Sequence, residues 1–261
     1  MYSGFHLAIG LLEIGAYTEA YTLAQRGLAI ARAQGMPAFL SACLTLLVKV
    51  QRAMLNLEAA RATHLEALSY NEALESRSFK AMIVAELCAV SALESRWTEA
   101  YDYAVHGLNM REALFHLYTG FTLWHETEAL VRAGDVERAA QDVRHLEERI
   151  GSSRRYRIPY LRAQFVLAEH HGAIDQALAY LQEAAQLAED IGLPGEVWSI
   201  QAVLGKVYQQ QGNEDMASRA FAHACEVLSS LAYKIADEQQ RTIFLSAEPA
   251  RQMLERACFL P

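Results

Sequence analysis

A six-residue phrase that returns six times along the chain constrains the fold more than any other feature. The closing alanines of successive copies are 40, 40, 39, 38 and 40 residues apart. A fixed period of this length is typical of repeat proteins, in which each unit packs against its neighbours. The copies are GAYTEA at Gly15–Ala20, LNLEAA at Leu55–Ala60, SRWTEA at Ser95–Ala100, GDVERA at Gly134–Ala139, GAIDQA at Gly172–Ala177 and GNEDMA at Gly212–Ala217.

Each copy of the phrase is predicted to end one helix and begin the next. Its first residue is glycine in four of the six copies, which suits the left-handed backbone that closes a helix. Its fourth residue is Thr, Glu or Asp, and we expect such a side chain to accept hydrogen bonds from free amides or to complement the helix dipole. The closing alanine would let two helices approach closely. The phrase therefore predicts a helical hairpin.

The flanking sequence supports long helices. Alanine accounts for 44 of the 261 residues, whereas there are only 5 prolines and 14 glycines. Apolar residues recur at spacings of three and four on both sides of the phrase, as Leu7, Leu11 and Ile14 do before the first copy. Two helices of this length cannot bury their apolar faces alone, so neighbouring pairs must stack.

At this point the residues resemble the tetratricopeptide family. The sixth repeat fits its pattern best, and the resemblance covers about residues 2–232, although the period exceeds the usual 34 and larger side chains at Cys88, Thr127 and Phe165 replace a small residue. The resemblance implies an all-α, right-handed solenoid of six antiparallel hairpins. The matching residues of the sixth repeat are Leu204, Gly205, Tyr208, Ala217, Phe221 and Ala224.

The resemblance divides the chain into units. The tail at Leu231–Glu255 is also similar to the C-terminal helical-repeat regions of MalT- and LuxR-type bacterial regulators and of ATPase–cyclase proteins, which receive a signal or partner and restrain an ATPase. A natural protein that extends beyond Met1 would follow. We expect C-terminal capping helices over 236–261, with Ser246 as the N-cap of the last one. The expected repeats span about 2–37, 38–77, 78–116, 117–154, 155–194 and 195–234.

Charge and composition limit the partners. The chain has 23 basic and 31 acidic residues, a net charge of −8, which opposes nucleic-acid binding and argues against RNA-reading helical repeats of shorter period. The first residues lack a basic secretory leader, no apolar stretch reaches the roughly 20 residues of a membrane span, and the four cysteines have no CxxC spacing. These features predict a cytoplasmic protein with reduced thiols.

No catalytic or cofactor motif is found in the sequence. Phosphate-binding loops, a GxSxG elbow and HExxH are all missing. The metal-like groups are only pairs: His125 with Glu128, His170 with His171, and His223 with Cys225. Since a metal site needs three or four ligands, we expect no metal, no cofactor and no enzyme activity.

The resemblance places a ligand groove on the first helix of each hairpin. Five of the eight charged residues at the mapped groove positions are basic, in a chain that is acidic overall. The positions in the third repeat are apolar and are followed by two aromatic residues, which would suit a peptide or a small effector. The candidate binding residues are Lys49, Arg52, Met82, Ala85, Ala89, Leu93, Phe121, Trp124, Glu128, Arg132, Arg162 and Lys206.

Two alternatives stay open at this stage. If the superhelix curls tightly, the apolar stripe of the third repeat is ordinary core rather than a ligand floor. The expected function is a non-enzymatic scaffold that binds a protein segment or peptide in its groove, as part of a larger regulator. The alternative is an effector-sensing domain, in which a small molecule shifts an equilibrium in an attached ATPase or transcriptional regulator.

Overall fold

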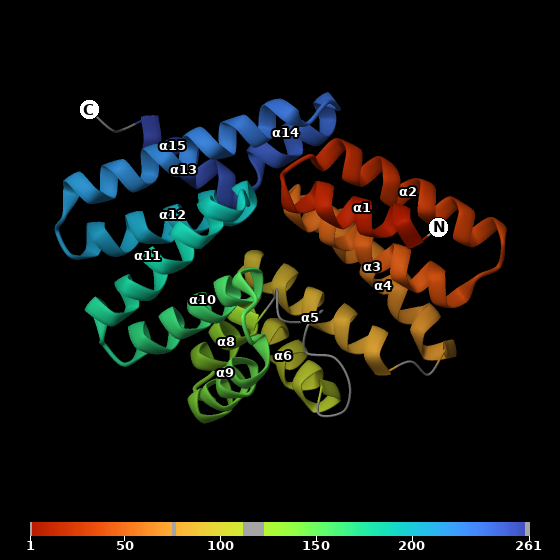
Figure 1. Cartoon of the computed structure of the whole chain (residues 1–261), viewed down its shortest axis with the longest axis horizontal. Coiled ribbons are helices and arrows are strands. Elements are labelled where there is room, and N and C mark those ends of the chain that lie inside the picture. Colours follow the sequence, from red (N-terminus) through yellow and green to blue (C-terminus); the bar gives the residue numbers. More distant parts are fainter. Residues whose placement is uncertain (1, 75–76, 112–122, 259–261) are drawn as a thin grey trace.

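The chain is all-helical, as the sequence predicts. A computed structural model describes residues 2–74, 77–111 and 123–258, and these residues form fourteen helices and no strand (Figure 1). The helices are α1 (Tyr2–Glu13), α2 (Tyr17–Ala33), α3 (Pro37–Ala53), α4 (Leu57–Leu74), α5 (Arg77–Leu93), α6 (Trp97–Arg111), α8 (Leu123–Arg132), α9 (Val136–Ile150), α10 (Arg154–His170), α11 (Ile174–Ile191), α12 (Pro194–Gln210), α13 (Glu214–Lys234), α14 (Glu238–Ser246) and α15 (Glu248–Cys258).

The first residue of every repeated phrase has the left-handed backbone that the pattern predicts. The four glycines have φ between +71° and +84°. Leu55 and Ser95, which replace glycine in two copies, also have positive φ, at 54° and 58°. A helix then begins at the third residue of each phrase, for example at Tyr17 and Leu57. The turn geometry is therefore kept even where a side chain makes it costly.

The closing alanines are buried, as expected for the close approach of two helices. Five of the six have no exposed surface and Ala217 is 2% exposed. Gly205 shows the same tight packing in the last repeat, because a Cβ atom there would overlap the ring of Phe221. These small residues set the spacing within the helix pairs.

Two capping predictions are wrong. Thr18 does not cap its own helix; its hydroxyl accepts a hydrogen bond from the Ala236 amide at 3.0 Å and donates one to the Lys234 carbonyl at 3.3 Å. Ser246 is the last residue of α14 rather than the N-cap of α15, and its hydroxyl donates to the Ile243 carbonyl. Each side chain is taken by a nearby backbone group that the local sequence pattern does not reveal.

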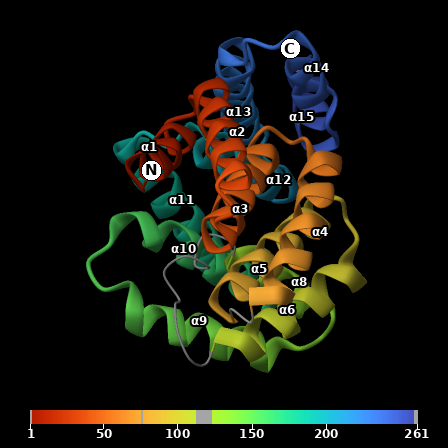
Figure 2. The same ribbon diagram turned by 90° about the vertical axis from the view of Figure 1, so that its right-hand side faces the viewer.

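Consecutive helices pack against each other along the chain, and the first helices of neighbouring pairs, α1, α3, α5, α8 and α10, also lie side by side. The chain runs round in sequence order so that the blue C-terminal helices come back to the red N-terminal ones (Figures 1 and 2). The right-handed, six-hairpin form of the solenoid stays a prediction.

The two ends of the repeat array meet at a contact that we call the closure seam. It joins the turn between α1 and α2, at Gly15–Thr18, to the start of α12 and the end of α13. A Cβ atom on Gly15 would meet the side chains of Leu231 and Pro194, the latter at 2.9 Å. The helical array therefore closes on itself, which the sequence analysis did not anticipate.

Candidate functional site

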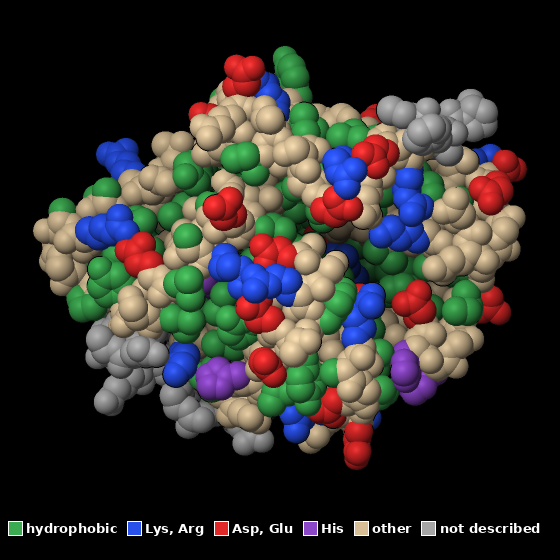
Figure 3. Space-filling model, turned by 180° about the vertical axis from the view of Figure 1, so that it is seen from behind, with side chains coloured by type: hydrophobic (Ala, Val, Ile, Leu, Met, Phe, Trp, Pro, Cys, Tyr) green, Lys and Arg blue, Asp and Glu red, His purple; other side chains and the backbone are tan. Residues whose placement is uncertain are grey.

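The closed array encloses a cavity of about 340 Å³ that we call the central cavity. Its lining comes from the odd-numbered helices α1, α3 and α5 and from α8, α10 and α12, with a contribution from the seam. The rear surface has a hollow where Lys, Arg, Asp and Glu side chains gather (Figure 3). The lining residues include Glu13, Tyr17, Lys49, Arg52, Leu55, Glu86, Leu93, Trp124, His125, Arg155, Arg162, Glu196, Trp198 and Ser199.

One side of the central cavity carries two cations that share one carboxylate. The Arg52 Nε atom donates to Glu86 Oε2 at 2.7 Å, and the Lys49 Nζ atom lies 3.6 Å from Glu86 Oε1. Burial alone would raise the pKa of Glu86, but Arg52 and Lys49 outweigh burial and lower it. Glu86 is therefore ionised, and this side of the cavity is positive by one charge.

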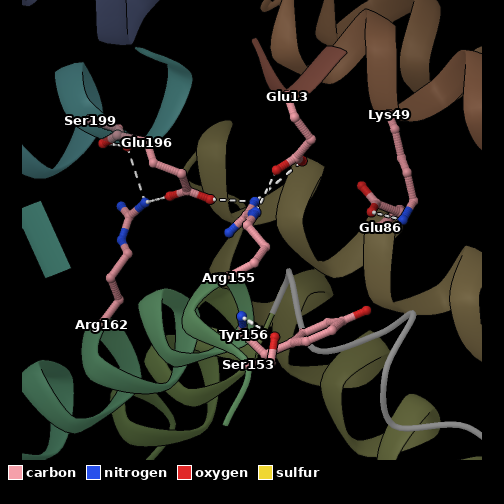
Figure 4. A network of polar contacts seen from close by, with 9 residues as sticks. All are labelled: Glu13, Lys49, Glu86, Ser153, Arg155, Tyr156, Arg162, Glu196 and Ser199. Atoms are coloured by element: carbon pink, nitrogen blue, oxygen red, sulfur yellow. Dashed lines mark hydrogen bonds and ion pairs between the residues drawn. The ribbon is translucent and has the colours of Figure 1, made fainter. Parts of the chain in front are cut away.

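The other side carries a chain of ion pairs across the closure seam (Figure 4). Arg155 binds Glu13 of α1 and also donates to Glu196 Oε1 at 3.1 Å. Arg162 Nη1 donates to Glu196 Oε2 at 2.8 Å and to the Ser199 hydroxyl at 3.0 Å. The pKa of Glu196 is lowered because these two arginines outweigh the effect of its burial. The chain links α1, α10 and α12.

Arg162 and Trp124 separate the central cavity from a neighbour. The Arg162 guanidinium lies over the Trp124 ring, 3.7 Å from its centroid, and both residues line both cavities. The second space, which we call the side cavity, also measures about 340 Å³. Its lining includes Glu128, Val131, Arg132, Phe165, Val166, Glu169, His170, Val203 and Lys206.

His125 is a buried imidazole at the wall of the central cavity. It is 3% exposed and its ring lies beside that of Trp124. Burial, together with the positive charges of Arg52 and Arg162, lowers the pKa of His125 well below its usual range. The ring is therefore neutral at physiological pH.

The structure brings all five basic candidates to the two cavities. Lys49 and Arg52 line the central cavity, Arg132 and Lys206 line the side cavity, and Arg162 lines both. Among the other candidates, Leu93 lines the central cavity, Glu128 the side cavity and Trp124 both.

The remaining candidates lie elsewhere. Ala85 and Ala89 are buried in the helix packing, at 1% and 0% exposure, and Met82 is half-buried. None of these three is among the residues that line either cavity. Phe121 lies outside the described residues.

Sequence reasoning missed Arg155 and Glu196, which hold the ion-pair chain together. The tetratricopeptide pattern places groove positions on a 34-residue unit, whereas the repeats here are 38–40 residues long. Arg155 and Glu196 lie in the first turns of α10 and α12, before the positions to which the pattern maps the groove. The excess length of the repeat was the signal that could have extended the search by one helical turn.

Within the described ranges, no group of three or more His, Cys, Asp and Glu side chains is placed to hold a metal ion. The predicted pairs follow separate courses: His125 packs on Trp124, whereas His223 Nδ1 lies 3.7 Å from Glu189. No helix among the described residues is long and apolar enough to cross a membrane.

Comparisons with known proteins bear on the fold alone. No protein-family model and no curated protein match the sequence. The crystal structure of BtubC (BKLC) from P. vanneervenii is similar, with a TM-score of 0.53 and 16% identity over 81% of this chain and 90% of that chain. This likeness shows a shared helical fold.

Proposed function

We propose that this chain is a ligand-binding solenoid of the tetratricopeptide type, built from six hairpins, and that its central cavity holds a small effector. The observation that carries the proposal is closure. Contacts at Gly15 and Thr18 join the two ends of the array, so the concave side is a bounded cavity rather than an open groove. A volume of about 340 Å³ is within the range of small-molecule sites.

The lining also supports binding in the cavity. Trp124 and Trp198 supply large flat apolar surfaces, whereas Arg52 and Arg162 supply fixed charges. A few placed polar groups in an aromatic wall are typical of sites that orient a ligand. We propose binding without chemical conversion, because the carboxylates Glu13, Glu86 and Glu196 are held in ion pairs rather than left available as a base.

A second candidate is the scaffold function, in which the cavity takes the end of a protein segment. The side cavity favours it, because it adjoins the central cavity across the Arg162–Trp124 stack. Two neighbouring subsites would suit two successive side chains of a peptide. Either ligand would fit the resemblance to regulator domains, in which binding biases an attached output domain.

The test uses Trp124→Ala against Trp97→Ala. Trp97 is a matched control because it lies under Arg132, 4.0 Å from the Arg132 guanidinium carbon, and lines neither cavity. Small-molecule and short-peptide libraries are screened by thermal shift on the wild type and both variants. A cavity ligand raises the melting temperature of the wild type and of Trp97→Ala, and its affinity falls by about 2 kcal/mol or more in Trp124→Ala.

The screen separates the candidate functions. Hits among small molecules alone support the effector function, and hits among peptides alone support the scaffold. If Trp124→Ala instead lowers stability by about 3–5 kcal/mol and leaves binding of every hit unchanged, Trp124 is core and the cavity is not the site.

A further inference from the structure

The central cavity is more basic than the chain that encloses it. Four basic side chains line it, Lys49, Arg52, Arg155 and Arg162, against the three carboxylates of Glu13, Glu86 and Glu196. The whole chain has a net charge of −8. A cavity with one excess positive charge inside an acidic protein focuses a local field that attracts an anion.

Arg52 uses only part of its hydrogen-bonding capacity. Its Nε atom donates to Glu86, which Lys49 also contacts. Within the described part of the chain, its Nη1 and Nη2 atoms have no hydrogen-bond partner, and the side chain keeps 22% of its surface exposed. The outer edge of this guanidinium therefore offers free donors to the central cavity.

Arg162 is held more rigidly and is also incompletely used. Its Nη1 atom donates to Glu196 and Ser199, and its flat face is stacked on Trp124. The residue is 4% exposed, yet its Nε and Nη2 atoms have no hydrogen-bond partner among the residues described. A buried guanidinium fixed on two sides is preorganised for a bound group.

The two arginines converge on one neutral ring. Both act on His125 through their charges, although they come from different helices, α3 and α10. Their own carboxylates, Glu86 and Glu196, lie on opposite sides of the cavity lining. An anion between the two guanidinium groups would relieve the repulsion of like charges and satisfy the free donors.

We propose that the central cavity binds a small organic acid, whose single carboxylate or phosphate lies between Arg52 and Arg162. The apolar body of this ligand lies against Trp124, Trp198 and Leu93, which line the same space. The assignment rests on the proposed effector function and names the chemical class of the effector.

The first test measures whether the cavity concentrates anions. Trp97→Phe removes the tryptophan that lies outside the cavities, so that fluorescence reports Trp124 and Trp198. Quenching by iodide is compared with quenching by neutral acrylamide at constant ionic strength. We expect iodide to quench at least as well as acrylamide, and Arg52→Gln to lower the iodide constant about twofold or more while the acrylamide constant stays unchanged.

A matched variant locates the anion. Arg132→Gln removes a cation of the side cavity and should leave iodide quenching intact. If Arg132→Gln rather than Arg52→Gln lowers it, or if iodide quenches poorly in all variants, the assignment is overturned while a neutral effector remains compatible with the cavity. If acrylamide also fails to reach both tryptophans, the cavity is closed to solutes and the effector function itself falls.

The second test separates the two kinds of acid. Benzoate, phenyl phosphate and neutral benzamide are titrated while the Arg52 side-chain and Trp198 indole resonances are followed by NMR. Saturable shifts with benzoate or phenyl phosphate, lost in Arg52→Gln and absent with benzamide, support the proposal and show which anionic group fits. Equal shifts with benzamide, or no shift with either acid, overturn it.

Discussion

Contacts between neighbouring helix pairs differ in kind from contacts at the closure seam. Neighbouring pairs are joined by ion pairs of short sequence separation, as Arg52–Glu86 and Arg162–Glu196 are, each 34 residues apart. At the seam, Arg155 meets Glu13 across 142 residues, and Thr18 meets the backbone of Ala236 across 218. The first kind repeats with the period of the sequence, whereas the second exists once.

The repeated phrase shows the same difference within a single motif. Gly134, Gly172 and Gly212 need only their positive φ, because a Cβ atom there would meet nothing within 4 Å. Gly15 has the same backbone, but it also has Leu231 and Pro194 packed on it. One turn of the array has thus become a joint while keeping the sequence of an ordinary turn.

The largest expected effect comes from Glu196→Gln. Glu196 neutralises both Arg155 and Arg162, and Arg162 would be left buried with only Ser199 as a hydrogen-bond acceptor. Breaking a buried ion pair from one side costs about 3–5 kcal/mol, which chemical denaturation would measure. Glu13→Gln is the control, since Arg155 keeps Glu196, and its cost should stay near 1 kcal/mol or less. Equal losses would mean that the seam pair stabilises the fold as much as the neighbour pair.

Acid should remove the difference between the wild type and Glu196→Gln. The pKa of Glu196 is lowered in the folded protein, because Arg155 and Arg162 outweigh burial. The unfolded chain therefore takes up this proton at a higher pH, near 4.3, than the folded chain does. The stabilisation is present above that pH and is lost as the pH falls through the lower folded value. Denaturation curves measured from pH 7 downward should show the two proteins converging below about pH 4.

The next effect is that of Gly15→Ala. A side chain there would combine the strain of a φ of +77° with a collision against Leu231 and Pro194. We expect a loss of about 2–4 kcal/mol, from roughly equal backbone and packing contributions. Gly172→Ala, with a φ of +71° and open space, should cost only about 1–2 kcal/mol. If the two variants melt together, the seam is not closed in solution.

The sequence predicts whatever depends on one repeat and its neighbour. Periodicity gave the helices, the left-handed turns and the buried Ala100 and Ala139, because each follows from local backbone geometry and close packing. The wrong caps at Thr18 and Ser246 show the limit of this reasoning, since the backbone partner of the Thr18 hydroxyl lies more than 200 residues away.

The site was only partly predictable for the same reason. The groove pattern found Arg52 and Arg162, which lie on faces fixed by helical spacing. It could not find that Arg155 meets Glu13, because that contact depends on the rotation accumulated over all the repeats. A small error in the angle of each unit, summed round the array, decides whether the ends meet or pass each other.

The smallest expected effect tests the seam with the least disturbance. Thr18→Val keeps the shape of the side chain and removes a hydroxyl that serves the Ala236 amide and the Lys234 carbonyl. The loss should be about 1 kcal/mol, and hydrogen exchange at the Ala236 amide should speed up. Thr22→Val is the control, because its hydroxyl bonds only the Thr18 carbonyl within the same helix. Faster exchange at Ala236 in Thr18→Val alone would show that this hydroxyl holds the end of α13 to the first turn, whereas unchanged exchange would mean that the two ends separate readily and that the cavity opens through the seam.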